Sequence, residues 1–353
     1  MTTTVDGVVA VDLLLEEFLA GKARDIHLVD PALDALAATA RNAVLGGGKR
    51  LRPAFAYWGW RGVVGTGPPA APVLPAFAAL ELLHAFALVH DDVMDDSATR
   101  RGRPSAHVAL AGWHARGGLT GDAARFGRSA AILVGDLLLV WADELIASAG
   151  LPGDIVIAAR RVYDRMRVDA ISGQFLDLVG ELSREWSFER AELVARLKTA
   201  CYTVVGPLLF GAALSGYADQ SVTRAYARYG MAVGEAFQLR DDLLDAYGDP
   251  ATTGKPVGAD LRSGKPTPLL ELARSMADGG QRTELERELG RGPDAEPARL
   301  ARLVRWTGAA ERVERMIAER VTDARAALAD APIEPEIRRE LDILASIATD
   351  RNV

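Results

Sequence analysis

The sequence has few residues of several kinds, and each shortage excludes a class of protein. Its single cysteine, Cys201, cannot form an internal disulfide and supplies no tetrahedral zinc site, so we expect a reducing, cytoplasmic setting. The 41 basic residues are outnumbered by 48 acidic ones, which excludes the broad positive field that attracts nucleic acid. Any anionic ligand must therefore be held by local groups.

Long apolar runs suited to a membrane are also lacking. The segment 1–12 has no basic stretch ahead of an apolar run, so no secretory signal is expected. The longest uncharged stretch, 62–80, contains four prolines, which would leave backbone groups unsatisfied in lipid. We therefore expect no transmembrane segment.

Helical spacing of apolar residues prevails along the chain. Ala, Leu, Arg and Glu are frequent, and no alternating strand pattern is present, so the fold is predicted to be all-α. The predicted helices cover 33–45, 53–60, 75–95, 129–149, 155–179, 191–216, 222–247, 267–277 and the 300–349 region.

Two acidic motifs are similar in sequence, HDDVMD at 90–95 and RDDLLD at 240–245. In each motif the first and last aspartates lie four positions apart, so a helix would place both carboxylates on one face. These pairs are Asp91 with Asp95 and Asp241 with Asp245. Each motif directly follows an apolar helical run, and carboxylates crowded at the edge of an apolar interior require a cation. Ligands with oxygen atoms only favour Mg²⁺.

Basic residues near the start of the chain and just after the first acidic motif predict a phosphate ligand. Magnesium held by one or two carboxylates keeps positions open for water and for substrate phosphate oxygens. The chain supplies counter-charges in GGGKRLRP at 46–53 and in RRGR at 100–103. The glycine spacing matches neither GxxxxGK[ST] nor GxGxxG after a strand, which disfavours a nucleotide-binding loop.

The set of motifs resembles the polyprenyl synthetase family, the head-to-tail trans-isoprenyl diphosphate synthases. The motifs stand in order: GGKRLRP (47–53), ELLHAFALVHDDVMDDSATRRGRPS (81–105), AILVGDLLLVWADEL (131–145), GQFLDL (173–178), KT (198–199), FQLRDDLLD (237–245) and GKPVGADLRSGKPT (254–267). The resemblance covers 33–344 and leaves 1–30 peripheral. It implies a single domain over 1–353, a helical bundle around a central apolar cavity, and a homodimer.

The resemblance also assigns roles to individual residues. About three Mg²⁺ ions would be held on an allylic prenyl diphosphate by Asp91, Asp92, Asp95, Asp241, Asp242 and Asp245. Arg100, Lys198, Thr199, Gln238 and Lys255 would contact the allylic diphosphate, and Lys49, Arg52, His84 and Arg101 would bind isopentenyl diphosphate. Lys265 would join the phosphate cage, and Gln174 and Asp177 match a pair near the reacting centre. The residues expected to act in catalysis are Asp91, Asp95, Arg100, Gln174, Lys198, Asp241 and Lys255.

Two other functions are compatible with parts of this pattern. A class I terpene cyclase also ionises a prenyl diphosphate at DDxxD, but its second metal motif is typically of the Asn/Ser/Glu type. A non-catalytic regulatory subunit should have lost aspartates, whereas both motifs are complete here. The departures from the family pattern are the extra acid Asp96, Pro266 where Arg is frequent, and a C-terminus, 350–353, with one base.

Product length is predicted from the residues before the first acidic motif. At 1.5 Å per residue, Phe86 would lie about 7.5 Å and Leu83 about 12 Å from Asp91 along a helix axis. An aromatic residue five positions before the first aspartate resembles geranylgeranyl diphosphate synthases, whereas a second adjacent aromatic favours farnesyl diphosphate synthases. The neighbour here is Ala87, so we expect a C20 product, with C15 as the alternative.

Overall fold

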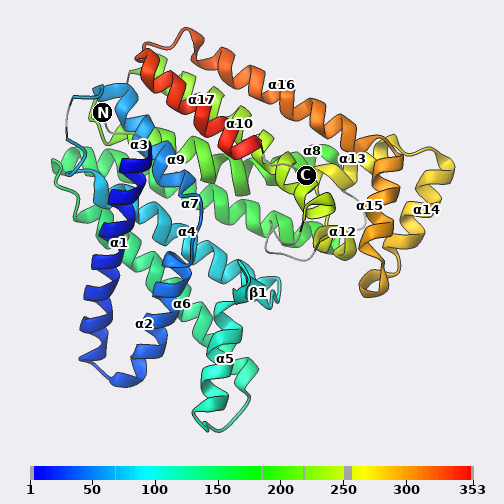
Figure 1. Ribbon diagram of the computed structural model, residues 1–353, viewed down its shortest axis with the longest axis horizontal. Coiled ribbons are helices and arrows are strands. Elements are labelled where there is room, and N and C mark those ends of the chain that lie inside the picture. The colour runs from blue at the N-terminus through cyan, green and yellow to red at the C-terminus, as the bar shows by residue number, and fades with distance from the viewer. Residues whose placement is uncertain (1–3, 68, 184–185, 218, 250–256, 351–353) are drawn as a thin grey trace. The chain divides into compact units, whose positions relative to one another are not determined.

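The computed structural model describes residues 4–67, 69–183, 186–217, 219–249 and 257–350 (Figure 1). The chain divides into two compact units. Unit 1 comprises 1–57 and 66–157, and unit 2 comprises 58–65 and 158–353. Among the described residues all regular elements are helical except two strands of two residues each, which confirms the all-α prediction. The extent of a single domain over 1–353 remains a prediction.

Unit 1 is built around α4, which packs against α6. Its elements are α1 (Thr4–His27), η1 (Pro31–Leu33), α2 (Asp34–Leu45), the first half of α3 (Leu51–Val64), α4 (Leu74–Met94), β1 (Thr99–Arg100), β2 (Arg103–Pro104), α5 (Ala106–Arg116) and α6 (Ala123–Ala147). Pro75 opens α4, where its missing N–H costs nothing. The side chains of Phe55, Phe77 and Leu80 are wholly buried and form part of the core.

The segment 1–30, which the sequence analysis sets outside the core, contributes α1 to unit 1. Leu15 and Leu19 on α1 are buried. Phe18 packs edge to face against Trp141 of α6, with 6.4 Å between ring centroids. The N-terminal helix therefore covers the core of this unit.

Unit 2 is built around α10, which packs against α16 and η2. α7 (Gly153–Leu182) enters it from unit 1, and the remaining elements are α8 (Phe188–Ala195), η2 (Arg196–Val205), α9 (Gly206–Ala213), α10 (Gln220–Tyr247), α12 (Ala259–Ser263), α13 (Pro268–Met276), α14 (Gly279–Leu289), η3 (Gly292–Asp294), α15 (Pro297–Trp306), α16 (Ala309–Ala329) and α17 (Pro335–Thr349). The cap of α10 is Asp219, whose carboxylate accepts the Ser221 N–H at 2.6 Å.

Two predicted helices are divided in the structure. The segment predicted as one helix over 191–216 consists of α8, the π-helix η2 and α9, and the helical backbone continues through all three. The region 300–349 contains three helices, because Gly308 adopts a left-handed conformation before α16 and Pro335 starts α17.

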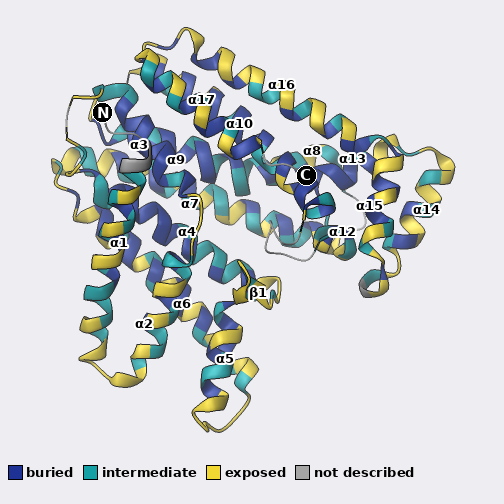
Figure 2. Ribbon diagram, viewed as in Figure 1, coloured by how far each residue is buried: buried dark blue, intermediate teal, exposed yellow. Residues whose placement is uncertain are grey.

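Helices α4 and α10 are rich in buried residues, whereas α16 exposes much of its outer side (Figure 2). By length and composition alone, α4 and the continuous stretch Phe188–Ala213 could cross a membrane. In each, 56% of the apolar window is buried inside the protein, as in a core helix. The expectation of no transmembrane segment therefore stays a prediction.

Candidate active site

The first acidic motif lies at the end of α4, where its three aspartates differ in burial. Asp92 is only 3% exposed, whereas Asp91 is half-buried and Asp95 is exposed. Asp95 caps the helix, and its N–H donates to the Asp91 carbonyl at 2.8 Å. The helix thus turns Asp92 inward and leaves Asp91 and Asp95 nearer to solvent.

Arg100 closes over this motif from strand β1. Its Nε donates to Asp92 Oδ1 at 2.9 Å, its Nη2 donates to the same oxygen, and Nη2 also lies 3.4 Å from Asp91 Oδ2. Burial raises the pKa of Asp92, and the Arg100 guanidinium opposes that rise. Burial also disfavours the charge on Arg100, but the neighbouring carboxylates outweigh it and raise its pKa. Asp92 therefore serves to hold Arg100 beside the two outer carboxylates.

The glycine-rich loop before α3 meets the β1–β2 turn through Arg101. The Arg101 guanidinium donates to the Gly47 carbonyl and lies against Gly48. Arg50, in the same loop, is buried and fixed by Glu81 of α4 at 2.6 Å and Asp12 of α1 at 2.8 Å. Arg50 therefore anchors the loop, a role that the sequence analysis did not foresee.

Positive charge gathers around His84 in unit 1. Burial lowers the pKa of His84 well below its usual value, and the guanidinium groups of Arg52, Arg101, Arg100 and Arg50 lower it further. Burial together with these like-charged neighbours also lowers the pKa of Arg101, against the pull of Glu81. The structure thus brings together the predicted residues Arg52, His84 and Arg101, while Lys49 lies exposed on the adjoining loop. Such a concentration of cations is suited to a diphosphate.

The second acidic motif lies near the end of α10 and repeats the pattern of the first. Asp242 is 3% exposed, Asp245 is half-buried and Asp241 is exposed. Burial raises the pKa of Asp242 well above its usual value. Its carboxylate accepts the Gln238 amide at 2.8 Å and the Leu269 N–H at 3.3 Å. Asp245 accepts the Asp260 N–H at 3.1 Å, which ties α12 to the motif.

Two predicted substrate contacts on η2 and α10 form one hydrogen-bonded chain. Thr199 Oγ1 donates to Gln238 Oε1 at 2.6 Å, and the amide of Gln238 donates to Asp242. The amide oxygen of Gln238 therefore faces Thr199, and its amide nitrogen faces Asp242. The chain places Thr199 within reach of the acidic motif through a single side chain.

The predicted phosphate ligands Lys198 and Lys265 converge on Asp177 of α7. Their Nζ atoms lie 2.7 and 2.8 Å from the same oxygen, Asp177 Oδ2. Gln174 lies half-buried on α7, about one turn before Asp177. Asp177 is buried and holds two ammonium groups side by side, and Lys265 also lies 3.6 Å from Glu181. A diphosphate that displaced these carboxylates would meet both ammonium groups together. The predicted residue Lys255 lies outside the described residues.

The aspartates fit magnesium by the chemistry of their ligand atoms. All are hard oxygen donors, and each helix presents two of them beside a buried third. Among the described residues, no group of three or more metal-binding side chains comes together. A cation held at either motif would therefore complete its coordination with water or with ligand oxygens.

The residues predicted to set product length lie on α4 at different depths. Leu83 is buried, and Phe86 and Ala87 are half-buried. The Phe86 ring packs edge-on against His90, with 4.7 Å between centroids, and His90 Nε2 lies 3.0 Å from the Ile132 carbonyl of α6. The aromatic side chain is thus supported from one side by α6.

Comparison with known proteins settles the family. The polyprenyl synthetase family model matches residues 34–305. The chain belongs to the polyprenyl synthetase family. A geranylgeranyl diphosphate synthase from Mycobacterium tuberculosis is 35% identical over 82% of this chain and 77% of its own length. A nonaprenyl diphosphate synthase from the same organism is 32% identical over 94% of this chain and 93% of its own.

A solved structure of the family matches almost the whole chain. It is the geranylgeranyl pyrophosphate synthase of Corynebacterium glutamicum, complexed with isoprenyl diphosphate and magnesium. It shares 38% identity, covers 97% of this chain and 98% of its own, and superposes with a TM-score of 0.91. Members of the polyprenyl synthetase family transfer prenyl groups, so the predicted enzyme class is confirmed.

Proposed function

We propose that this polyprenyl synthetase condenses isopentenyl diphosphate head to tail with an allylic diphosphate and releases an all-trans C20 prenyl diphosphate. The observation that carries this proposal is the pairing of each acidic motif with its own set of cations. Unit 1 has Arg100 at the motif and the Arg52, His84 and Arg101 cluster, and unit 2 has the lysines on Asp177. Two diphosphate substrates require two such sets.

The outer aspartates are proposed as the magnesium ligands. Asp91 and Asp95 on α4, and Asp241 and Asp245 on α10, have the accessible carboxylates, while Asp92 and Asp242 are buried in hydrogen bonds. When bound, Mg²⁺ would neutralise the charge that develops on the allylic diphosphate as its C–O bond breaks.

The protein's own cations share that task. Lys198 and Lys265 would leave Asp177 for the departing diphosphate, and Thr199 and Gln238 would orient it by hydrogen bonds. Both lysines would exchange one anionic partner for another, so their charges would stay paired as the diphosphate leaves. Arg52 and Arg101 would hold isopentenyl diphosphate so that its double bond attacks the allylic carbon. The proton lost from the new chain would pass to the released diphosphate.

The C20 product is supported by the residues before Asp91. Ala87 lies one turn before Asp91 on the same helix face and has a small side chain, whereas Phe86 packs against His90 and Leu83 is buried two turns before Asp91. A chain that grows along this helix would stop at these side chains. A C15 product is the second candidate, because the same two bulky residues would also limit a shorter cavity.

Incubation of the purified protein with isopentenyl diphosphate, Mg²⁺ and dimethylallyl, geranyl or farnesyl diphosphate tests the proposal directly. We expect a prenyl diphosphate whose formation is abolished by EDTA, and chromatographic sizing of the dephosphorylated product gives its length. Cyclic hydrocarbons would identify a cyclase instead, and the absence of any product would favour a regulatory subunit.

We also propose a homodimer. On α7, Val168, Ile171 and Phe175 form an apolar stripe at helical spacing and are 58%, 58% and 65% exposed. A stripe of this kind is typical of a surface that a second copy covers. We expect Ile171→Glu to yield a monomer by sedimentation analysis. Ile343→Glu, at a comparably exposed position on α17, should leave the dimer intact.

A further inference from the structure

Helix η2 carries Lys198 and Thr199 and has an unusual backbone. It is a π-helix over Arg196–Val205, in which hydrogen bonds span five residues instead of four, and the Gly206 N–H donates to the Cys201 carbonyl at its end. Such helices are rare and are concentrated at functional sites. Its wider turns change which side chains face a given neighbour, so the rotation of η2 determines where Lys198 and Thr199 point.

Glycines on two neighbouring helices let η2 lie very close to them. A Cβ atom on Gly173 of α7 would come within 2.5 Å of the Lys198 backbone nitrogen, and one on Gly234 of α10 within 2.4 Å of the Ala200 Cα. These contacts hold the backbone of η2 between α7 and α10. Because glycine has no side chain, these two contacts include no interdigitated side chains that would restrict the rotation of η2.

Polar links join η2 to α10, in addition to the ion pair between Lys198 and Asp177 of α7. The Arg196 Nε, at the start of η2, donates to Glu235 Oε1 at 2.6 Å. The hydroxyl of Thr199, three residues later, donates to Gln238, which is three residues after Glu235. Two side-chain hydrogen bonds therefore join η2 to α10.

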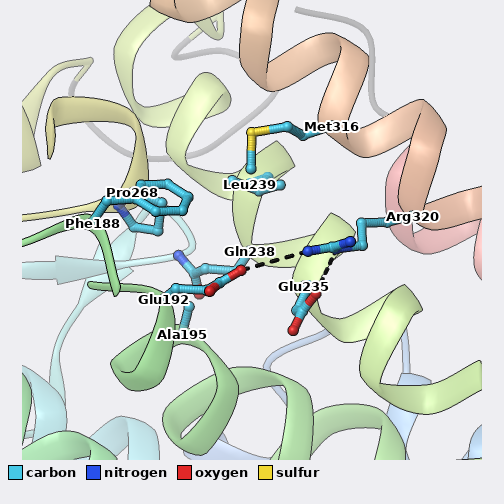
Figure 3. A pocket seen from close by; sticks show the side chains of 9 residues that line it. All are labelled: Phe188, Glu192, Ala195, Glu235, Gln238, Leu239, Pro268, Met316 and Arg320. Carbon is cyan, nitrogen blue, oxygen red and sulfur yellow. Dashed lines mark ion pairs between the residues drawn. The ribbon is translucent and has the colours of Figure 1, made fainter. Parts of the chain in front are cut away.

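Glu235 is the buried centre of a group of four charged side chains, of which Glu192, Glu235 and Arg320 are drawn in Figure 3. It is 7% exposed, and its second oxygen lies 2.6 Å from Arg320 Nε of α16. Glu192 of α8 completes the group, 3.2 Å from Arg196 and 3.5 Å from Arg320. The negative charges of the two carboxylates equal the positive charges of the two guanidinium groups, so the ion pairs offset the cost of burying the Glu235 charge.

We infer that Glu235 is a positioning residue for the allylic diphosphate site, holding η2 through Arg196 in the rotation that directs Lys198 and Thr199 to the substrate. The inference rests on the proposed function and adds a residue to its machinery that touches no substrate. Glu235 lies a turn and a half before Asp241 on α10, so the same helix fixes both the acidic motif and η2.

The matched variants Glu235→Gln and Glu314→Gln test this role. Both remove an ion pair between α10 and α16, since Glu314 binds Arg240 at 2.7 Å, but only Glu235 also binds η2. We expect Glu235→Gln to raise the KM for geranyl diphosphate roughly tenfold, the usual worth of one charge-assisted contact. Its KM for isopentenyl diphosphate should stay unchanged, and Glu314→Gln should leave both KM values at those of the parent.

Arg196→Gln removes the same ion pair from the side of its more exposed partner. It should reproduce the geranyl diphosphate defect, and the double variant Glu235→Gln/Arg196→Gln should be no worse than the more affected single variant. Equal KM values for Glu235→Gln and Glu314→Gln would overturn the inference. If Glu235→Gln fails to fold by circular dichroism, an unchanged KM for Arg196→Gln would overturn it. A parent protein that forms no prenyl diphosphate would instead refute the proposed function.

Discussion

Changing Asp91 and Asp92 separately to asparagine should distinguish metal binding from folding on α4. The two carboxylates are adjacent in the chain, but only Asp92 is buried, and only Asp92 accepts two N–H groups of Arg100. Asp91→Asn should therefore reduce turnover, whereas Asp92→Asn should mainly reduce stability.

The structure gives a magnitude for each change. Hydrogen bonds to a charged group are worth about 1.5 to 3 kcal/mol, and the amide introduced by Asp92→Asn would also direct a donor at Arg100. Relief from burying a charge offsets part of that loss, so we expect Asp92→Asn to lower the free energy of unfolding by about 2 kcal/mol. Asp91 lies 3.4 Å from Arg100 and is partly exposed, and its loss should cost less than about 1 kcal/mol.

Two measurements check the pair. Urea denaturation without Mg²⁺ gives the free energies of unfolding, and steady-state turnover at saturating Mg²⁺ gives kcat. For Asp91→Asn we expect kcat to fall by a factor of about 100 or more, because a metal ligand loses its charge. The reasoning is refuted if Asp91→Asn is the less stable variant while Asp92→Asn has the lower kcat.

The site and the core support three further predictions. Lys49→Ala and Arg52→Ala should raise the KM for isopentenyl diphosphate by roughly tenfold to a hundredfold and leave the KM for the allylic diphosphate unchanged. Lys198→Ala should do the reverse. Equal effects of these variants on both KM values would contradict two separate sites. Phe86→Ala should remove the ring proposed to limit the growing chain and lengthen the product beyond C20, and an unchanged product distribution would show that Phe86 is not the stop. Burial raises the pKa of Tyr247 to about 12, above the ordinary value of 10. As the pH rises, the unfolded chain loses this proton before the folded protein does, so the free energy of unfolding should fall between about pH 10 and 12. Tyr247→Phe should reduce that fall in the free energy of unfolding measured by urea titration.

The sequence was sufficient for the elements with strong periodic patterns. Helical spacing predicted α4 and α10, and the four-residue separation within each acidic motif predicted which aspartates share a face. The burial of Asp92 and Asp242 is consistent with the same helical periodicity. Each follows the first aspartate of its motif by one residue, so its side chain points about 100° away from that aspartate, toward the apolar side of the helix.

Other features depend on contacts between distant segments and could not be predicted from local patterns. The sequence over 191–216 is typical of one continuous helix, and no local pattern marks its π-helical section, which lies against Gly173 and Gly234 of two other helices. Likewise, Glu235 and Arg196 give no local signal, because their pairing exists only once η2 lies against α10. Helix α5 (Ala106–Arg116) lies outside the predicted helices, and the ring of its Trp113 stacks on Phe126 of α6.

The turn between β1 and β2 limits how this enzyme can be redesigned. Arg101 and Gly102 both have positive φ, as a two-residue hairpin turn requires, and the strands pair Arg100 with Arg103. Consecutive residues thus serve different partners: Arg100 holds the aspartates, and Arg101 holds the glycine-rich loop. An insertion in this turn, or a residue at 102 that cannot adopt positive φ, would strain the backbone that positions both guanidinium groups. Engineers who want to alter the affinity for one substrate alone should leave this turn intact and vary Lys49 or Lys198, which are proposed to contact different substrates and lie on separate backbone segments.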